Sequence, residues 1–252
     1  MEPVSAGHRL EPVVVVMTKV PGMAVVKSRL HDSLGAARAT ELYRCFLLDR
    51  LDAVASLDGI SGAVAYTPRE AEALMRSLAP PSLGLVPQRG ADLGERLSAV
   101  LTELLGRGHA GALAVDSDSP TLPMAYVKEA ARALAASTCD VVLGPCEDGG
   151  YYLVGLRSPQ PALFEGIPWS TDAVFTLTVA KARASGLSVH VLPRWFDVDT
   201  EADLQRLHAE IVAGPPGPRR TSAFVRELYR SVGAKAGLRA APGVAAGESQ
   251  CS

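Results

Sequence analysis

Short apolar segments alternate with amphipathic ones along most of this chain, and this order predicts an α/β fold with a mainly parallel sheet. The first apolar segment, residues 13–17, reads VVVVM without polar alternation, as expected for a strand buried on both faces of a sheet. Charged residues and glycines cluster directly after several strand candidates. This placement is typical of a ligand site at the carboxyl edge of a parallel sheet.

The first third of the chain predicts three strands and two helices. Residues 36–56 place apolar side chains on one broad face at helical spacing, and Gly59 closes this segment. Further along, we expect a strand at 62–66, a helix at 70–79 and a weaker strand at 83–88.

The same alternation continues through the rest of the chain. Asp92 and Glu95 have the spacing of a capping box and precede an amphipathic helix that ends at Gly106 or Gly108. The remaining expected elements are a strand in 111–119, a helix at 124–137, two strands joined by a connection rich in glycine and acid within 140–156, a helix at 172–185, a strand at 187–193, and a helix that begins at Thr200 with Asp203 in the capping position.

The chain of 252 residues predicts one main domain at 12–213, preceded by an extension at 1–11. The breaker cluster GPPGPRR marks the start of a C-terminal region at 214–252, in which we expect a helix at 221–232 followed by a flexible tail.

Composition narrows the class of protein. Hydrophobic residues make up 48% and the net charge is -2, so no general electrostatic attraction to nucleic acid or to an anionic membrane is expected. The four cysteines contain no CxxC pair, and neither a secretory leader nor an apolar run of membrane length is evident. We therefore expect a cytoplasmic protein without nucleic-acid or membrane partners, and the sequence leaves a homodimer open.

A basic loop follows the first strand candidate. Lys19, Lys27 and Arg29 surround Pro21 and Gly22, and lysine and arginine side chains together are suited to holding phosphate oxygens. A solvated basic loop before a helix is the simpler alternative. The sequence alone does not separate the two interpretations.

Two aspartates follow the apolar run in the segment LAVDSDSP, residues 113–120. Asp116 and Asp118 are hard oxygen ligands, and such pairs bind Mg²⁺ or Mn²⁺ that bridges to nucleotide phosphates. If the strand continued through them, its alternation would turn both side chains to one face. The alternative is an Asp-Ser turn in which Asp118 or Ser119 caps the next helix.

Other acidic and aromatic residues also follow strand candidates. Asp197 and Asp199 form a second acidic pair, and Asp148 lies in the glycine-rich connection. Tyr151 and Trp169 could stack on a base or a sugar, although plain packing is as good an interpretation. The sequence has no GxSxG, HxxxH or GxxxxGK[ST] pattern and no GxGxxG after the first strand candidate, so serine-hydrolase, zinc, P-loop and dinucleotide-fingerprint chemistry lose support.

Six strings in order, TKVPGMAVVKSRL, GADLGERL, DSDSPTLP, GPCEDGGYYLVGL, FEGIPWST and DVDTEADL, resemble the bacterial DUF2064 family, or arsenosugar-biosynthesis-type glycosyltransferases. The resemblance spans about residues 13–208. It implies a Rossmann-like three-layer α/β/α sandwich of the GT-A, nucleotide-diphospho-sugar transferase type. KSRL and DVDTEADL are also similar to strings in phospholactate guanylyltransferases, and the latter string to molybdenum-cofactor guanylyltransferases, which transfer nucleotidyl groups.

The resemblance implies roles for individual residues. Lys27 and Arg29 match a basic pair that holds nucleotide phosphates, and both are expected to act in catalysis together with Asp118 and Asp148. Metal binding falls to Asp116, Asp118 and Asp199, with Mg²⁺ or Mn²⁺ as the cofactor. The expected nucleotide- or substrate-binding residues are Lys19, Pro21, Gly94, Ser117, Glu147, Gly149, Gly150, Tyr151, Trp169, Ser170 and Thr171.

Two positions depart from the family pattern. The family reads PxPG before the basic pair, whereas this chain has Pro21, Gly22, Met23 and Ala24, so the loop and its phosphate contacts are expected to differ. Ser119 stands where the family has cysteine, which argues against thiol chemistry at that point.

Taken together, these observations predict a metal-dependent transferase that binds an NTP or an NDP-sugar and a small-molecule acceptor. Nucleotidyl transfer to a phosphorylated acceptor is the favoured reaction, because the basic pair and the second acidic pair suit it. Glycosyl transfer from an NDP-sugar is the alternative, with Asp148 or Glu147 as the candidate base. A non-catalytic nucleotide-binding protein on the same fold is the second alternative.

Overall fold

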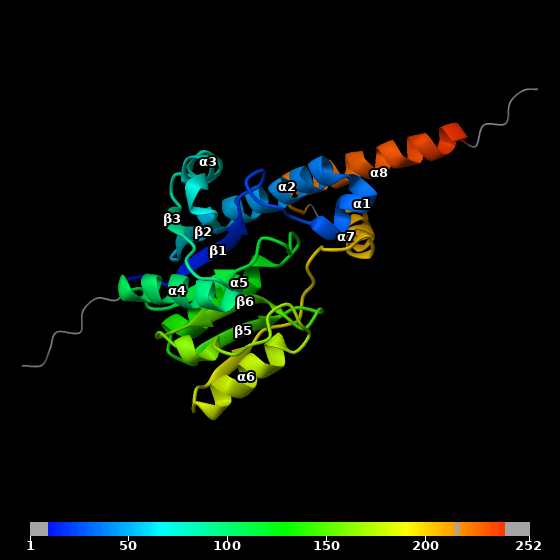
Figure 1. The fold of residues 1–252 in the computed structure, drawn as a ribbon. Coiled ribbons are helices and arrows are strands. Elements are labelled where there is room, and N and C mark those ends of the chain that lie inside the picture. Colours follow the sequence, from blue (N-terminus) through cyan, green and yellow to red (C-terminus); the bar gives the residue numbers. More distant parts are fainter. Residues whose placement is uncertain (1–9, 215–216, 240–252) are drawn as a thin grey trace, which may run out of the picture.

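The computed structural model of this chain describes residues 10–214 and 217–239, and it confirms the predicted α/β class (Figure 1). One sheet of seven strands has the order β3-β2-β1-β4-β6-β5-β7. In the described ranges, β6 alone runs antiparallel to its neighbours, while β1 pairs in parallel with both β2 and β4. The strands are β1 Val13–Lys19, β2 Ser61–Thr67, β3 Gly84–Pro87, β4 Ala112–Val115, β5 Val141–Pro145, β6 Tyr151–Leu156 and β7 Val189–Val191.

Helices cover both faces of the sheet, which gives the three-layer sandwich. Alternate residues of β1 divide between two cores: Val14 and Val16 pack with α2, α3 and α5, whereas Val13 and Val15 pack with α4 and α6. The helices are α1 His31–Leu34, α2 Ala36–Ala55, α3 Glu72–Leu78, α4 Leu93–Gly106, α5 Met124–Ala135, α6 Val174–Ala184, α7 Glu201–Ala213 and α8 Arg219–Arg239, with 3-10 turns η1 Ser28–Leu30, η2 Arg69–Ala71 and η3 Pro161–Leu163.

A third apolar cluster joins α7 and α8 to α2. Phe46 on α2 and Leu207 on α7 are fully buried in it, together with Val225 on α8. Helix α8 lies along α2, and its C-terminal end extends beyond the rest of the molecule (Figure 1). None of the helices in the described ranges combines the length and the hydrophobicity required to cross a bilayer.

Several boundaries differ from the sequence predictions. Strand β4 ends at Val115, so strand alternation does not govern Asp116 and Asp118, and the reasoning from alternation is wrong at that point. The final helix runs to Arg239 rather than ending at 232, so part of the expected tail is helical. The rest of that tail, 240–252, and the extension at 1–9 lie outside the described residues.

The two predicted helix caps have different outcomes. Thr200 and Asp203 form a complete capping box at the start of α7, as predicted. At α4, the Asp92 side chain accepts from the Glu95 amide, but the Glu95 carboxylate accepts from the Ala91 amide, one residue before the cap. The Asp92 half of that prediction is confirmed, and the reciprocal half is wrong.

Candidate functional site

A cavity of about 540 Å³ opens at the carboxyl ends of β1 and β4. The sheet order places β2 and β3 on one side of β1 and β4 on the other, so the cavity lies where the direction of strand addition reverses. Four cationic side chains line it, together with polar groups: Thr18, Lys19, Lys27, Ser28, Arg29, Tyr43, Thr67, Gln88, Arg96, Asp116, Ser117, Asp118, Ser170 and Asp199. We call it the basic cavity.

A second cavity of about 230 Å³ adjoins the first one. Leu93, Asp116, Asp118 and Ser170 line both cavities, so the two aspartates stand at the boundary. Its other lining residues are Cys146, Asp148, Gly150, Tyr151, Trp169, Thr171, Val174 and Asp197. Because four carboxylates and no Lys or Arg are found among these described residues, we call it the acidic cavity.

Lys27 connects two separate acidic segments. Its side chain is only 2% exposed, and its ammonium forms ion pairs with Asp118 and, at 2.8 Å, with Asp199 Oδ1. Burial alone would lower the pKa of Lys27, but the charges and hydrogen bonds of these two carboxylates outweigh burial and raise it. Lys27 therefore stays charged and holds the loop after β4 against the segment before α7.

The backbone at Lys27 is also unusual. Its φ of 49° lies in the left-handed region, just before η1. Arg29, two residues on, has a side chain that is 73% exposed and lies 3.9 Å from Asp199 Oδ2. The two residues of the predicted basic pair therefore differ in their environment. Lys27 is buried and paired with two carboxylates, whereas the exposed Arg29 guanidinium is able to reach an anion.

Ser119 holds the Asp116 side chain in place, and the buried Arg50 in turn holds Ser119. The Ser119 hydroxyl donates to Asp116 Oδ2 at 2.6 Å, and the buried Arg50 guanidinium donates to the Ser119 carbonyl. Asp116 Oδ1 is inaccessible to solvent and has no hydrogen-bond partner among the described residues. Burial raises the pKa of Asp116 to about 7, with Arg50 opposing the shift and Asp118 adding to it.

A chain of neutral hydroxyls supports the basic cavity. The Tyr43 hydroxyl lies 2.7 Å from Thr18 Oγ1 and 2.9 Å from Ser117 Oγ, and Ser117 donates to the Met17 carbonyl. Burial, followed by the charge of Asp118, raises the pKa of Tyr43 to about 12. Tyr43 therefore remains a phenol that fixes the ends of β1 and β4 relative to each other.

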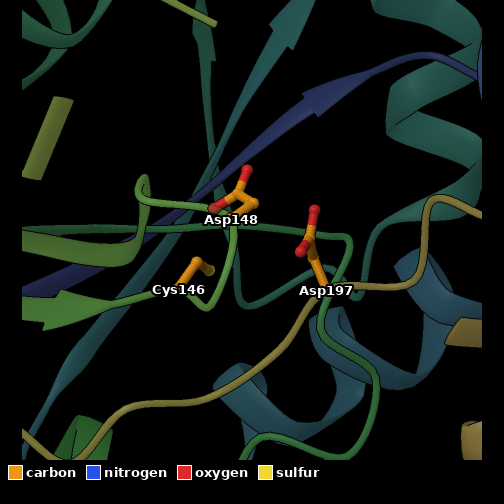
Figure 2. A group of neighbouring side chains, drawn as sticks. All are labelled: Cys146, Asp148 and Asp197. Carbon is orange, nitrogen blue, oxygen red and sulfur yellow. The ribbon is translucent and has the colours of Figure 1, made fainter. Parts of the chain in front are cut away.

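Cys146, Asp148 and Asp197 meet in the acidic cavity, although they come from two distant segments (Figure 2). Their potential ligand atoms lie within 4.8 Å of one another. Burial raises the pKa of Asp197 to about 6, and Asp199 and Asp148 add to this shift. Burial and then Asp116 raise the pKa of the Cys146 thiol. The acidic cavity thus brings an exposed carboxylate, Asp148, and a half-buried one, Asp197, next to a buried thiol.

Most of the residues predicted from sequence lie in one of the two cavities, whereas four line neither. Pro21 shapes the loop before Lys27 through a bridge to Ala24. Glu147 accepts from Arg206 at 2.7 Å. Gly94 and Gly149 have structural roles: a Cβ at Gly94 would lie 2.6 Å from Trp169 Nε1, and Gly149 has φ of 91° beside Asp172.

Sequence reasoning assigned no role to Tyr43, Gln88, Arg96 or Cys146 of the two cavities, and it considered Asp197 only as the partner of Asp199 in an acidic pair suited to a metal. Gln88 follows β3 at the same sheet edge, and its side-chain amide donates to the Thr18 and Ala65 carbonyls. Its position at the end of the strand candidate 83–88 was a usable signal, as was the pairing of Asp197 with Asp199. Tyr43, on α2, carried no such signal.

Known proteins resemble this chain in sequence and in fold. A profile of the family DUF2064, described as uncharacterized proteins conserved in bacteria, matches residues 50–171. The crystal structure of a proposed nucleotide-diphospho-sugar transferase from Desulfovibrio desulfuricans G20 is 32% identical, with a TM-score of 0.81 over 89% of this chain and 98% of that chain. No curated protein gives a significant match.

More distant structures share the fold. CMP:2-keto-3-deoxy-manno-octonic acid synthetase in complex with CTP is 12% identical, with a TM-score of 0.53 over 80% of this chain and 98% of its own. The 4-diphosphocytidyl-2C-methyl-D-erythritol synthase from Anaerococcus prevotii DSM 20548 is 11% identical, with a TM-score of 0.53 over 80% of this chain and 96% of its own. The family-profile match and the 32% identity to the Desulfovibrio protein confirm the family suggested by the six sequence strings: the chain belongs to the DUF2064 family and is a transferase with the fold of the nucleotide-diphospho-sugar transferases.

Proposed function

We propose that this chain is a metal-dependent nucleotidyltransferase that joins an NTP to a phosphorylated small molecule. The observation that carries the proposal is the boundary between the two cavities, where Asp116 and Asp118 separate a basic lining from an acidic one. A nucleoside triphosphate is an anion that suits Lys19, Arg29 and Arg96 of the basic cavity. The phosphorylated acceptor would meet the α-phosphate at this boundary.

The reaction needs positioning more than proton transfer. A phosphate oxygen of the acceptor forms a bond to the α-phosphorus, while the bond from that phosphorus to the α,β-bridging oxygen breaks. The bridging oxygen leaves with the electron pair on pyrophosphate. Because a phosphate is already an anionic nucleophile, no general base is required. Arg29, with its exposed guanidinium, would offset charge that develops on the leaving group.

A divalent cation, Mg²⁺ or Mn²⁺, would align the phosphates and offset their charge. Asp116, Asp118 and Asp199 are the residues that we expect to hold it, and their carboxylates fit a hard cation. Lys27 pairs with Oδ1 of Asp118 and of Asp199, and these two side chains are 38% and 40% exposed. Each therefore keeps a second oxygen that can reach a ligand from the cavity.

Glycosyl transfer is the second candidate, because one residue suits it better. Asp148 lines the acidic cavity, and its Oδ1 accepts from the Gly150 amide, which orients the carboxylate. An acceptor hydroxyl attacking an NDP-sugar needs a base, and Asp148 is a carboxylate in the cavity where that hydroxyl would bind. Nucleotidyl transfer leaves Asp148 without a chemical role.

The test is a pyrophosphate assay with each NTP, Mg²⁺ or Mn²⁺, and a panel of sugar 1-phosphates. We expect pyrophosphate release with one NTP and one class of acceptor, and a loss of at least 100-fold in kcat/KM for Asp118→Asn. The matched control is Asp58→Asn, an exposed carboxylate in the turn after α2, which should keep full activity. Transfer from an NDP-sugar without any pyrophosphate would overturn the proposal in favour of glycosyl transfer.

A further inference from the structure

The acidic cavity contains one sulfur atom among its carboxylates. Cys146 follows β5 directly and is 5% exposed, so its thiol lies at the base of the site rather than at its rim. Asp148 follows two residues later, and Asp197 arrives from the segment before α7 (Figure 2). We propose that Cys146, Asp148 and Asp197 form a divalent-cation centre with a thiolate ligand, separate from the cation bound to the nucleotide.

An unsatisfied oxygen of Asp116, which lines the same cavity, also points to a ligand. Asp116 Oδ1 exposes less than 1 Å² and has no hydrogen-bond partner among the described residues, while Oδ2 accepts from Ser119. Buried polar atoms are nearly always paired, because an unpaired one costs about 1–3 kcal/mol. Asp116 lines the same cavity as Cys146, Asp148 and Asp197. A cation between them would satisfy this oxygen.

The charges around the acidic cavity also favour a bound cation. Lys27 pairs with both Asp118 and Asp199, and Arg206 pairs with Glu147. Asp148 and Asp197 form no ion pair within the described part of the chain, although Asp197 lies in a largely buried position. Neighbouring carboxylates that lack a counter-charge repel each other. The cation that this cavity needs is therefore supplied by no side chain of the described structure.

The ligand set selects the kind of cation. Carboxylates alone suit Mg²⁺, whereas a thiolate favours softer ions such as Zn²⁺ and Co²⁺. Binding forms a metal–sulfur bond and releases the thiol proton to solvent, because a coordinated thiol is deprotonated. In other two-metal sites the ions lie about 3.5–4 Å apart, and Asp116, at the boundary of the two cavities, could supply an oxygen to each ion. The inference concerns cation binding alone and does not depend on the proposed reaction.

The test uses the full chain, stripped of metal and titrated with Co²⁺, whose bond to a thiolate gives a ligand-to-metal charge-transfer absorption. We expect this absorption to saturate at one Co²⁺ per chain. Cys146→Ser should abolish it and weaken Co²⁺ binding at least 10-fold by calorimetry. Asp148→Asn, at an exposed position that tolerates the change, should keep the absorption and lower the affinity.

Cys139→Ser is the matched control, because Cys139 is a free cysteine that is 4% exposed and lines neither cavity. It should keep both the absorption and the affinity. Co²⁺ binding without a charge-transfer absorption, or an absorption that survives Cys146→Ser, would overturn the inference. If Cys146→Ser fails to fold, an Asp148→Asn protein with unchanged Co²⁺ affinity would also overturn it. None of these outcomes bears on pyrophosphate release, so the two proposals fail separately.

Discussion

Lys27 is the residue on which the arrangement of the site depends most. Replacing it by methionine leaves Asp118 and Asp199 facing each other without their shared cation. We expect Lys27→Met to lower the free energy of unfolding by roughly 1–3 kcal/mol, below the full cost of breaking a buried pair because both carboxylates are partly exposed. Urea unfolding measures this change.

A double variant tests whether repulsion between Asp118 and Asp199 causes the loss of stability. Lys27→Met with Asp199→Asn removes one of the two repelling charges and should recover part of the lost stability without restoring activity. If the double variant is no more stable than Lys27→Met alone, repulsion between these carboxylates is not what the ammonium relieves.

Two glycines at positive φ allow a test of crowding in the connection after β5. Gly149 has φ of 91°, and a Cβ there would lie 2.2 Å from the Asp172 carbonyl oxygen, whereas Gly166 has φ of 62° and open space around it. Gly149→Ala should lower the free energy of unfolding by about 1–3 kcal/mol more than Gly166→Ala, because overpacking adds to backbone strain. Equal thermal shifts for the two variants would show that the contact is relieved without cost.

At the scale of elements, the cap of α7 fixes the acidic segment that precedes it. The Asp199 and Thr200 amides both donate to Asp203 Oδ2, and the Asp203 amide donates back to Thr200 Oγ1. Thr200→Ala should cost about 1 kcal/mol of stability and should also weaken Co²⁺ binding, since Asp197 lies only three residues before the cap.

The comparable change at α4, Asp92→Ala, is the control. Asp92 caps α4 with one side-chain bond, so we expect a similar loss of stability. Calorimetry with Co²⁺ should show no change in affinity. An equal loss of affinity in both variants would mean that global stability, rather than the cap of α7, controls the acidic cavity.

A different carboxylate joins three strands at the far end of β5. Asp140 accepts from Arg157 at 2.5 Å and from both the amide and the hydroxyl of Ser188, and these bonds lower its pKa from 3.8 to about 2. A carboxyl with a depressed pKa stabilises the fold above its unfolded pKa, and this contribution is lost as pH falls from about 4 to 2.

Asp140→Asn should therefore lower stability at pH 7 by about 1 kcal/mol, a value reduced for solvent screening of a partly exposed pair. The difference between the variant and the unchanged chain should shrink as pH falls below 4. A constant difference from pH 7 to pH 2 in urea unfolding would contradict the assigned role of the charge.

At the scale of the whole molecule, the sequence predicts the layers better than the order of the strands. The run VVVVM identifies β1 because a strand buried on both faces has no polar alternation. The sheet order around β1 and the reversed direction of β6 depend on packing between segments far apart in the chain. Periodicity within a segment carries no information on such contacts.

The candidate site, like the fold, could be predicted from the sequence only in part. Asp116, Asp118 and Asp199 could be proposed because each follows a strand candidate or resembles a family string, and they meet at one sheet edge. Lys27 and Asp199 are 172 positions apart, and no local sequence pattern predicts that they pair. Cys146 could not be predicted as a site residue for another reason. A lone buried cysteine usually serves only to pack the core, and the carboxylates next to Cys146 are brought there by the fold.

The fate of the α-phosphorus tests the central claim most directly. The chain is incubated with α-³²P-labelled NTP, a divalent cation and the acceptor found in the pyrophosphate assay, and the products are separated. Nucleotidyl transfer predicts that the label moves into the acceptor-linked product in equal amount with released pyrophosphate, and that Asp118→Asn abolishes both. Label that remains entirely in the NTP, while an NDP-sugar is consumed by the same protein, would contradict the account.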